Sequence, residues 1–161
     1  MDDLDELWRA LDRIATTSWL LVACDFDNAL APDLGDPENA RAEQASSEAL
    51  NVLLALPRTT VAVVSRRDPE QVAELMLLSG SKGGLRRVAP EDVAALRDEV
   101  EATGLLRVSA DGEGSSLRSG DLGITVIYEG GTAGTGSGYA VEDTEGVAEV
   151  LEELARLRRG T

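Results

Sequence analysis

The chain has 161 residues, which is typical of one domain, and 43% of them are hydrophobic, as expected for a globular protein. Its net charge of −15 argues against binding to nucleic-acid phosphates and to anionic lipid surfaces. Histidine is absent, which excludes Ser-His-Asp and Cys-His catalysis and the usual zinc sites.

Helical and strand patterns alternate along the sequence. The first half predicts a helix at 3–15, a strand at 19–24, a loop at 32–45, a helix at 46–56, a strand at 61–64 and a helix at 68–78. The second half predicts a glycine-rich loop at 80–84, a helix at 90–103, a strand at 105–108, a Gly/Ser-rich stretch at 112–120, a strand at 123–128, a flexible loop at 129–138 and a closing helix from 143 or 144.

This alternation indicates an α/β fold. The strands are apolar throughout, which is typical of a parallel sheet covered by helices on both faces. We expect residues 1–161 to form one three-layer, Rossmann-like domain. In such sheets ligands bind beyond the carboxyl ends of the strands, near a switch in strand order. The polar residues that follow the predicted strands are therefore candidate site residues: Asp25, Asp27, Ser65 and Asp111.

Asp25 and Asp27 are the sharpest local signal. Two neighbouring carboxylates at the end of a buried strand repel each other unless a cation or several N–H donors compensate for their charge. Mg²⁺ suits such a pair, and it would let a carboxylate attack a phosphoryl group because it screens both anions. The alternative is an ordinary loop start, since Asp is common there and Asn28 follows.

Several segments resemble haloacid dehalogenase-type phosphatases. Residues 20–32, LLVACDFDNALAP, look like the first motif of that superfamily and are closest to the DFDGTLAP of its trehalose-6-phosphate phosphatase branch. Residues 60–67, TVAVVSRR, are similar to the VAVVSGR of the family, and residues 78–83 look like the GSHG turn of the branch. Residues 120–157 resemble the last strand and closing helix, so the resemblance covers most of the chain.

The resemblance implies a Mg²⁺-dependent phosphate monoester hydrolase, with a sugar phosphate such as trehalose 6-phosphate as substrate. Asp25 would be the nucleophile that forms an aspartyl-phosphate, and Asp27 would protonate the leaving oxygen and then activate water. Ser65 would bind phosphoryl oxygens, and Lys82 would neutralise the phosphoaspartate. Asp25, Asp27 and Asp111 would hold the Mg²⁺.

The chain also departs from the family pattern. Asn28-Ala29 replaces Gly-Thr after the second acid, and Arg66 stands where the family has glycine. The sequence leaves no room for a cap domain, so we expect a capless core. The last acidic motif is reduced to Asp111 and its neighbours; aligned simply, its metal-binding Asp falls on Ala110, and Glu113 or Asp121 are alternatives for the third ligand.

Lys82 is the single lysine of the chain. A compact ammonium group could pair with a phosphoaspartate where a guanidinium fits less well, which favours a catalytic role. Against this, Lys82 stands where the related branch has a histidine in a turn, so a surface-turn role is the alternative.

Two functions follow. The first is a capless phosphatase whose open site is covered, if at all, by a second copy or a partner. The second is a catalytically inactive relative whose acidic surface meets a basic patch on a regulated protein. The acidic N-terminus and a single cysteine, Cys24, favour a cytoplasmic protein in which Cys24 is a small buried hydrophobe. From sequence alone, Asp25→Asn is expected to leave the fold intact or more stable.

Overall fold

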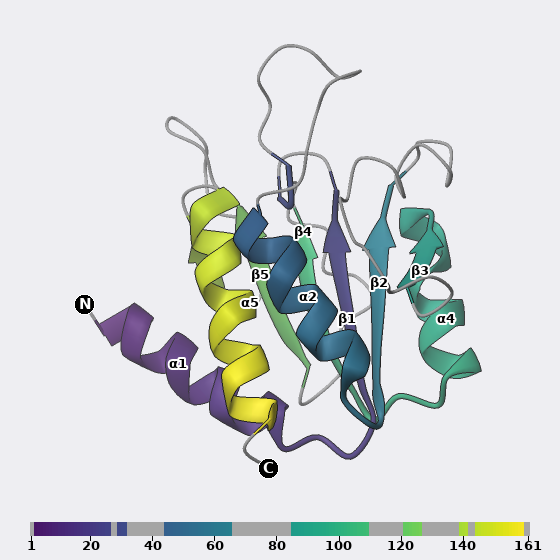
Figure 1. Cartoon of the computed structure of the whole chain (residues 1–161), viewed down its shortest axis with the longest axis horizontal. Coiled ribbons are helices and arrows are strands. Elements are labelled where there is room, and N and C mark those ends of the chain that lie inside the picture. Colours follow the sequence, from purple (N-terminus) through teal and green to yellow (C-terminus); the bar gives the residue numbers. More distant parts are fainter. Residues whose placement is uncertain are drawn as a thin grey trace.

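The computed structural model describes residues 2–26, 29–31, 44–65, 85–109, 121–126, 139–141 and 144–159. Figure 1 shows these residues as one sheet flanked by helices. The elements are α1 (Asp2–Ala15), β1 (Leu20–Asp25), α2 (Gln44–Ala55), β2 (Thr59–Val64), β3 (Leu85–Val88), the 3-10 turn η2 (Pro90–Asp92), α4 (Val93–Glu99), β4 (Gly104–Ser109), β5 (Leu122–Val126), β6 (Tyr139–Val141) and α5 (Thr144–Arg159).

The strands form a parallel sheet in the order β3-β2-β1-β4-β5-β6. From β1 the chain adds β2 and β3 on one side, then crosses over and adds β4, β5 and β6 on the other. The strand order therefore switches between β1 and β4, and folds of this kind bind ligands beyond the carboxyl ends of the strands at such a switch point. The predicted three-layer α/β architecture is confirmed.

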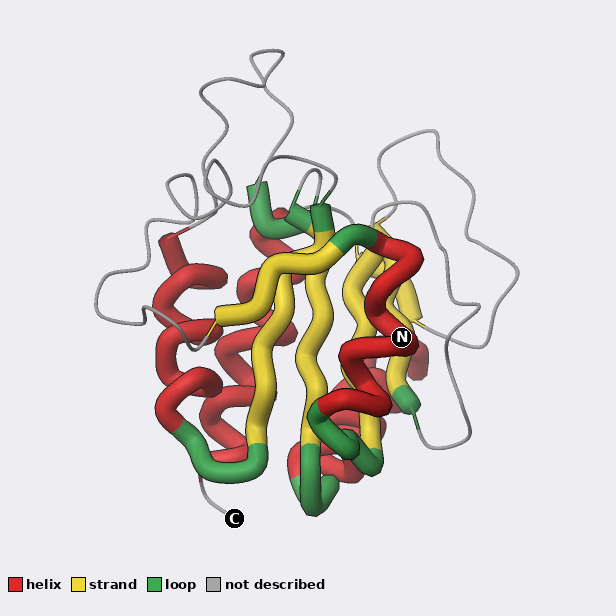
Figure 2. Tube along the Cα trace, turned by 90° about the vertical axis from the view of Figure 1, so that its right-hand side faces the viewer, coloured by secondary structure: helices red, strands yellow, loops and turns green. Residues whose placement is uncertain are grey.

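Each face of the sheet buries its own apolar side chains. Leu20, Val22 and Cys24 of β1 belong to the larger core, which includes buried residues of α1, α2 and α5. Leu21 and Ala23 point to the opposite face, where buried residues of α4 complete a smaller core. Helices therefore cover both faces (Figure 2), and a residue's position in β1 decides which layer its side chain enters.

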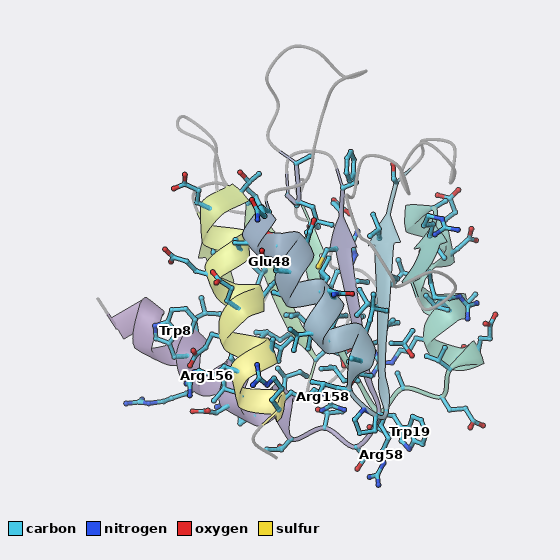
Figure 3. The ribbon with its side chains drawn as sticks, in the orientation of Figure 1. Trp8, Trp19, Glu48, Arg58, Arg156 and Arg158 are labelled. Carbon is cyan, nitrogen blue, oxygen red and sulfur yellow. The ribbon has the colours of Figure 1, made fainter. Side chains whose placement is uncertain are left out.

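Arg158, near the end of α5, forms hydrogen bonds with two segments at the amino edge of the sheet. Its guanidinium donates hydrogen bonds to the carbonyls of Ala15 (2.9 Å), Thr17 (2.8 Å) and Arg58 (2.9 Å), and to the Thr59 hydroxyl (2.6 Å). Figure 3 shows Arg158 and Arg58 at this lower end of the molecule. Burial lowers the pKa of Arg158, yet an arginine stays charged at neutral pH.

Two strands and one helix differ from the sequence-based prediction. β3 and β6 were not predicted. In β3, two arginines interrupt the apolar pattern of a buried strand, and β6 has only three residues at the far edge of the sheet. The helix expected at 90–103 starts as a 3-10 turn and ends at Glu99. The helix expected at 68–78 and the loops at 80–84, 112–120 and 129–138 lie outside the described residues. None of the helices described is long and apolar enough to cross a membrane.

Candidate functional site

Asp25 is the last residue of β1, at the carboxyl edge of the sheet and beside the switch point. Its Cα is in register with Val64 of β2, and the Phe26 N–H donates to the Val64 carbonyl at 3.0 Å, so the pairing continues one residue further. Phe26 is fully buried, and its carbonyl accepts a hydrogen bond from Ala31 N–H at 2.9 Å. These hydrogen bonds of Phe26 hold the backbone directly after Asp25 in place.

Ser65 follows β2 at the same edge. Its N–H donates to the Val88 carbonyl of β3 at 2.9 Å, which extends the sheet past the end of β2. Because Asp25 is in register with Val64, Ser65 lies one residue beyond Asp25 on a strand about 5 Å away. The structure therefore brings these two predicted site residues to neighbouring strand ends.

The other predicted site residues, Asp27, Lys82 and Asp111, lie outside the described residues, as does Glu113. Asp121, the remaining alternative for a metal ligand, is described. It stands just before β5, level with Leu105 of β4, whose N–H donates to Asp121 Oδ1 at 3.1 Å.

Asp121 is wrong as a metal ligand beside Asp25. In register it lies four residues below Asp25, about 13 Å along the strands and toward the amino edge. Its carboxylate has no exposed side-chain area and forms an ion pair with Arg97 of α4, including a hydrogen bond of 2.9 Å from Nη2 to Oδ1. Asp121 therefore has a structural role between α4 and the sheet.

Arg107 of β4 is a partner of Asp25 that was not predicted from the sequence. Its Nη2 donates to Asp25 Oδ1 at 2.7 Å, and its Nη1 donates to the Val108 carbonyl at 2.6 Å. Both side chains are largely removed from solvent, with 7% of Arg107 and 17% of Asp25 exposed. The signal in the sequence was a charged residue in the middle of the apolar run 105–108, because a charge buried in a sheet needs a partner.

Small neighbours make room for this arginine. On β1 the register partner of Arg107 is Ala23, and on β5 it is Gly123. Because register partners point to the same face of a sheet, the long Arg107 side chain is flanked by a methyl group on one side and by no side chain on the other. The guanidinium can therefore reach along β1 from the level of Ala23 to the carboxylate of Asp25.

Cys24 precedes Asp25 and points to the other face of the sheet, into the larger core. Burial raises the pKa of the Cys24 thiol to about 12, with smaller opposing effects of the Arg107 and Asp25 charges. The thiol stays protonated at neutral pH and is a poor nucleophile. The expectation of a small buried hydrophobe is confirmed.

Of the three residues expected to hold a divalent metal ion, the structure describes Asp25 alone. Among the residues that the structure describes, no group of three His, Cys, Asp or Glu side chains could hold one. The one predicted ligand within them, Asp25, already shares Oδ1 with a guanidinium. The positive charge that a carboxylate needs at a partly buried place is here supplied by Arg107.

Several solved structures resemble this chain. No protein-family model matches the sequence, and no curated protein matches it. Trehalose-6-phosphate phosphatase from Aspergillus fumigatus superposes with a TM-score of 0.65 at 13% identity, over 96% of this chain and 98% of that one. A phosphatase of the YrbI family from Pseudomonas syringae gives a TM-score of 0.58 at 17% identity, over 93% and 92%.

A third structure carries ligands. The 3-deoxy-D-manno-octulosonate 8-phosphate phosphatase from Moraxella catarrhalis, in complex with a magnesium ion, a phosphate ion and the sugar acid, gives a TM-score of 0.62 at 14% identity, over 98% of this chain and 94% of that one. Identities this low show the fold alone. The three structures are those of phosphatases, and this chain has their fold, as its motifs predicted.

Proposed function

We propose that this chain hydrolyses phosphate monoesters at the carboxyl edge of its sheet, with Asp25 as the nucleophile. The position of Asp25 carries the proposal: it ends a central strand at the switch point between β1 and β4, where folds of this kind bind ligands. The solved structures named above support it, because they are those of phosphatases, two of which are named for a phosphorylated sugar or sugar acid.

The proposed reaction has two steps. A carboxylate oxygen of Asp25 attacks phosphorus, the P–O bond to the alcohol breaks, and Asp27 gives the leaving alkoxide a proton. Asp27 then takes a proton from water, the water oxygen attacks phosphorus, and the bond between phosphorus and Asp25 breaks to release inorganic phosphate. The resemblance further assigns Ser65 and Lys82 to the phosphoryl oxygens, and a sugar phosphate such as trehalose 6-phosphate as the substrate.

The Asp25→Asn variant tests this function. Turnover of p-nitrophenyl phosphate and of trehalose 6-phosphate is compared for the wild type, Asp25→Asn and Asp12→Asn, a matched change at an exposed position of α1. We expect Asp25→Asn to lose roughly a thousandfold or more, because an amide is a far weaker nucleophile than a carboxylate, and Asp12→Asn to lose nothing. Equal turnover in Asp25→Asn and the wild type would show that Asp25 is not the nucleophile.

A second function is favoured by the ion pair itself. A guanidinium that hydrogen-bonds to the nucleophilic carboxylate stabilises its charge and makes it less reactive. The chain would then be a catalytically inactive relative that binds a protein partner through its acidic surface. Absence of turnover in the folded wild type, both with Mg²⁺ and with a chelator, favours this function over hydrolysis.

A further inference from the structure

We propose that Arg107 is the built-in cation of this site: it takes the place of a divalent metal ion against Asp25, so that the site binds phosphate without Mg²⁺ and binds Mg²⁺ only when Arg107 is removed. The inference deepens the proposed function, on which it rests only for the place of the phosphate. The part that concerns metal binding holds whether or not the chain hydrolyses esters.

Arg107 occupies one carboxylate oxygen of Asp25. A divalent ion bound by Asp25 needs at least one of its carboxylate oxygens, and Arg107 Nη2 lies 2.7 Å from Oδ1. Arg107 cannot simply swing away, because its Nη1 is held by the Val108 carbonyl at 2.6 Å and only 7% of its side chain is exposed. A metal ion at Oδ1 would have to displace a guanidinium held at two points.

One carboxylate and one guanidinium at hydrogen-bond distance sum to zero, so Asp25 exerts little net attraction on another cation. A divalent ion at Oδ1 would also lie against the positive charge of Arg107, in a place where burial weakens the screening by water. The pair as a whole therefore attracts Mg²⁺ only weakly, and the guanidinium of Arg107 offers its positive charge to an incoming phosphoryl group.

A guanidinium has five N–H donors, and the described residues use two of them, for Asp25 and Val108. Its planar fork suits phosphoryl oxygens, and even without direct contact its fixed charge lowers the repulsion between Asp25 and a phosphate. A metal ion has this role where a carboxylate meets a phosphate. Here the cation would be a side chain of β4.

The experiment measures the melting temperature with two probes, inorganic phosphate in the presence of EDTA and MgCl₂ alone, each against potassium chloride of the same ionic strength. A ligand that binds the native state raises the melting temperature by mass action. We expect the wild type to be stabilised by phosphate in EDTA and not by MgCl₂.

Three variants make the test specific. Arg107→Met keeps the apolar stem of the side chain and removes its charge, and we expect it to lose the phosphate response and to gain a response to MgCl₂. Adding Asp25→Asn to Arg107→Met should abolish that new response. Arg86→Met is the matched control, since Arg86 is a partly exposed arginine on β3 that pairs with Glu99, and it should behave like the wild type.

Four results would overturn the inference. They are a wild type that phosphate in EDTA does not stabilise, a MgCl₂ response of the wild type that Asp25→Asn removes, an Arg107→Met protein that is folded by circular dichroism yet ignores MgCl₂, and an Arg107→Met protein that keeps the full phosphate response. If Arg107→Met does not fold, Arg107→Gln replaces it, and the two wild-type measurements decide by themselves. Absence of turnover with these responses intact would reject hydrolysis and leave the inference standing.

Discussion

Arg107 Nη2 lies 2.7 Å from Asp25 Oδ1, across the boundary between β4 and β1 at which the strand order switches. The register partner of Arg107 is Ala23, so the guanidinium reaches two residues along β1 to meet the carboxylate. The ion pair therefore compensates for the charge of a carboxylate at the end of a buried strand.

Asp25→Asn should destabilise the protein, contrary to what the sequence alone favours. The sequence shows a carboxylate near another acid, whose removal should relieve repulsion, whereas the structure shows a carboxylate that neutralises a buried arginine. An asparagine can still accept a hydrogen bond but brings no charge, so we expect a loss of about 1–3 kcal/mol in the free energy of unfolding. Urea denaturation measures it.

The same assay on Arg107→Met and on the double variant completes a double-mutant cycle for this pair. A favourable coupling of about 1 kcal/mol or more is expected, because each partner compensates for the other's burial. An Asp25→Asn protein as stable as the wild type, with no coupling to Arg107, would show that the pair contributes nothing.

Asp121→Asn should cost more, about 3–5 kcal/mol, because it breaks an ion pair whose carboxylate is wholly buried and whose arginine, Arg97, is 5% exposed. The exposed ion pair of Arg86 and Glu99 offers a matched control that also involves α4. Glu99→Gln should cost less than about 1 kcal/mol, because both side chains face solvent. Similar losses for the two variants in chemical denaturation would contradict the structural role of Asp121.

Gly104→Ala should destabilise the start of β4. A Cβ atom at residue 104 would lie 2.8 Å from Cγ2 and 2.9 Å from Oγ1 of Thr17, closer than carbon contacts allow. We expect a loss of about 1–3 kcal/mol in thermal or chemical unfolding, typical of overpacking. Thr17→Ala removes both of these atoms, so the combination of the two changes should recover part of the loss; additive losses would show that the contact is not the cause.

Cys24 gives a pH dependence above pH 9. Burial raises the pKa of its thiol from the ordinary value of 9.0 to about 12, so the unfolded thiol ionises first. Its contribution to stability is complete below pH 9 and is lost as the pH rises toward 12, by up to about 1.4 kcal/mol per pH unit. Stability measured just below pH 9 and one unit above should fall less in Cys24→Ala than in the wild type; equal slopes would contradict the shift.

The sequence predicts those parts of the fold that have a strong periodic or apolar pattern. The buried strands β1 and β2 and the long helices α1 and α5 lie close to their predicted positions, because continuous apolar runs and helical stripes reflect burial directly. β3 was hidden because Arg86 and Arg87 occupy an edge strand, where charged side chains can reach water. Local pattern does not distinguish such a strand from a loop.

The candidate site was predicted only in part. Asp25 and Ser65 were found because they directly follow apolar runs, and the structure brings both to one edge. Arg107 was missed because its role depends on register: which residue it meets is decided by the pairing of β4 with β1, across more than eighty positions of sequence. Asp121 was misplaced for the same reason. Only the pairing of β5 with β4 shows that Asp121 lies toward the amino edge of the sheet, away from Asp25.

A crystal structure of the protein grown with both Mg²⁺ and inorganic phosphate tests the account most directly. The account predicts phosphate at the carboxyl edge beside Ser65, Arg107 Nη2 still within hydrogen-bond distance of Asp25 Oδ1, and no metal ion on Asp25. An octahedral magnesium ion bound to Asp25, with the guanidinium of Arg107 turned away, would contradict it.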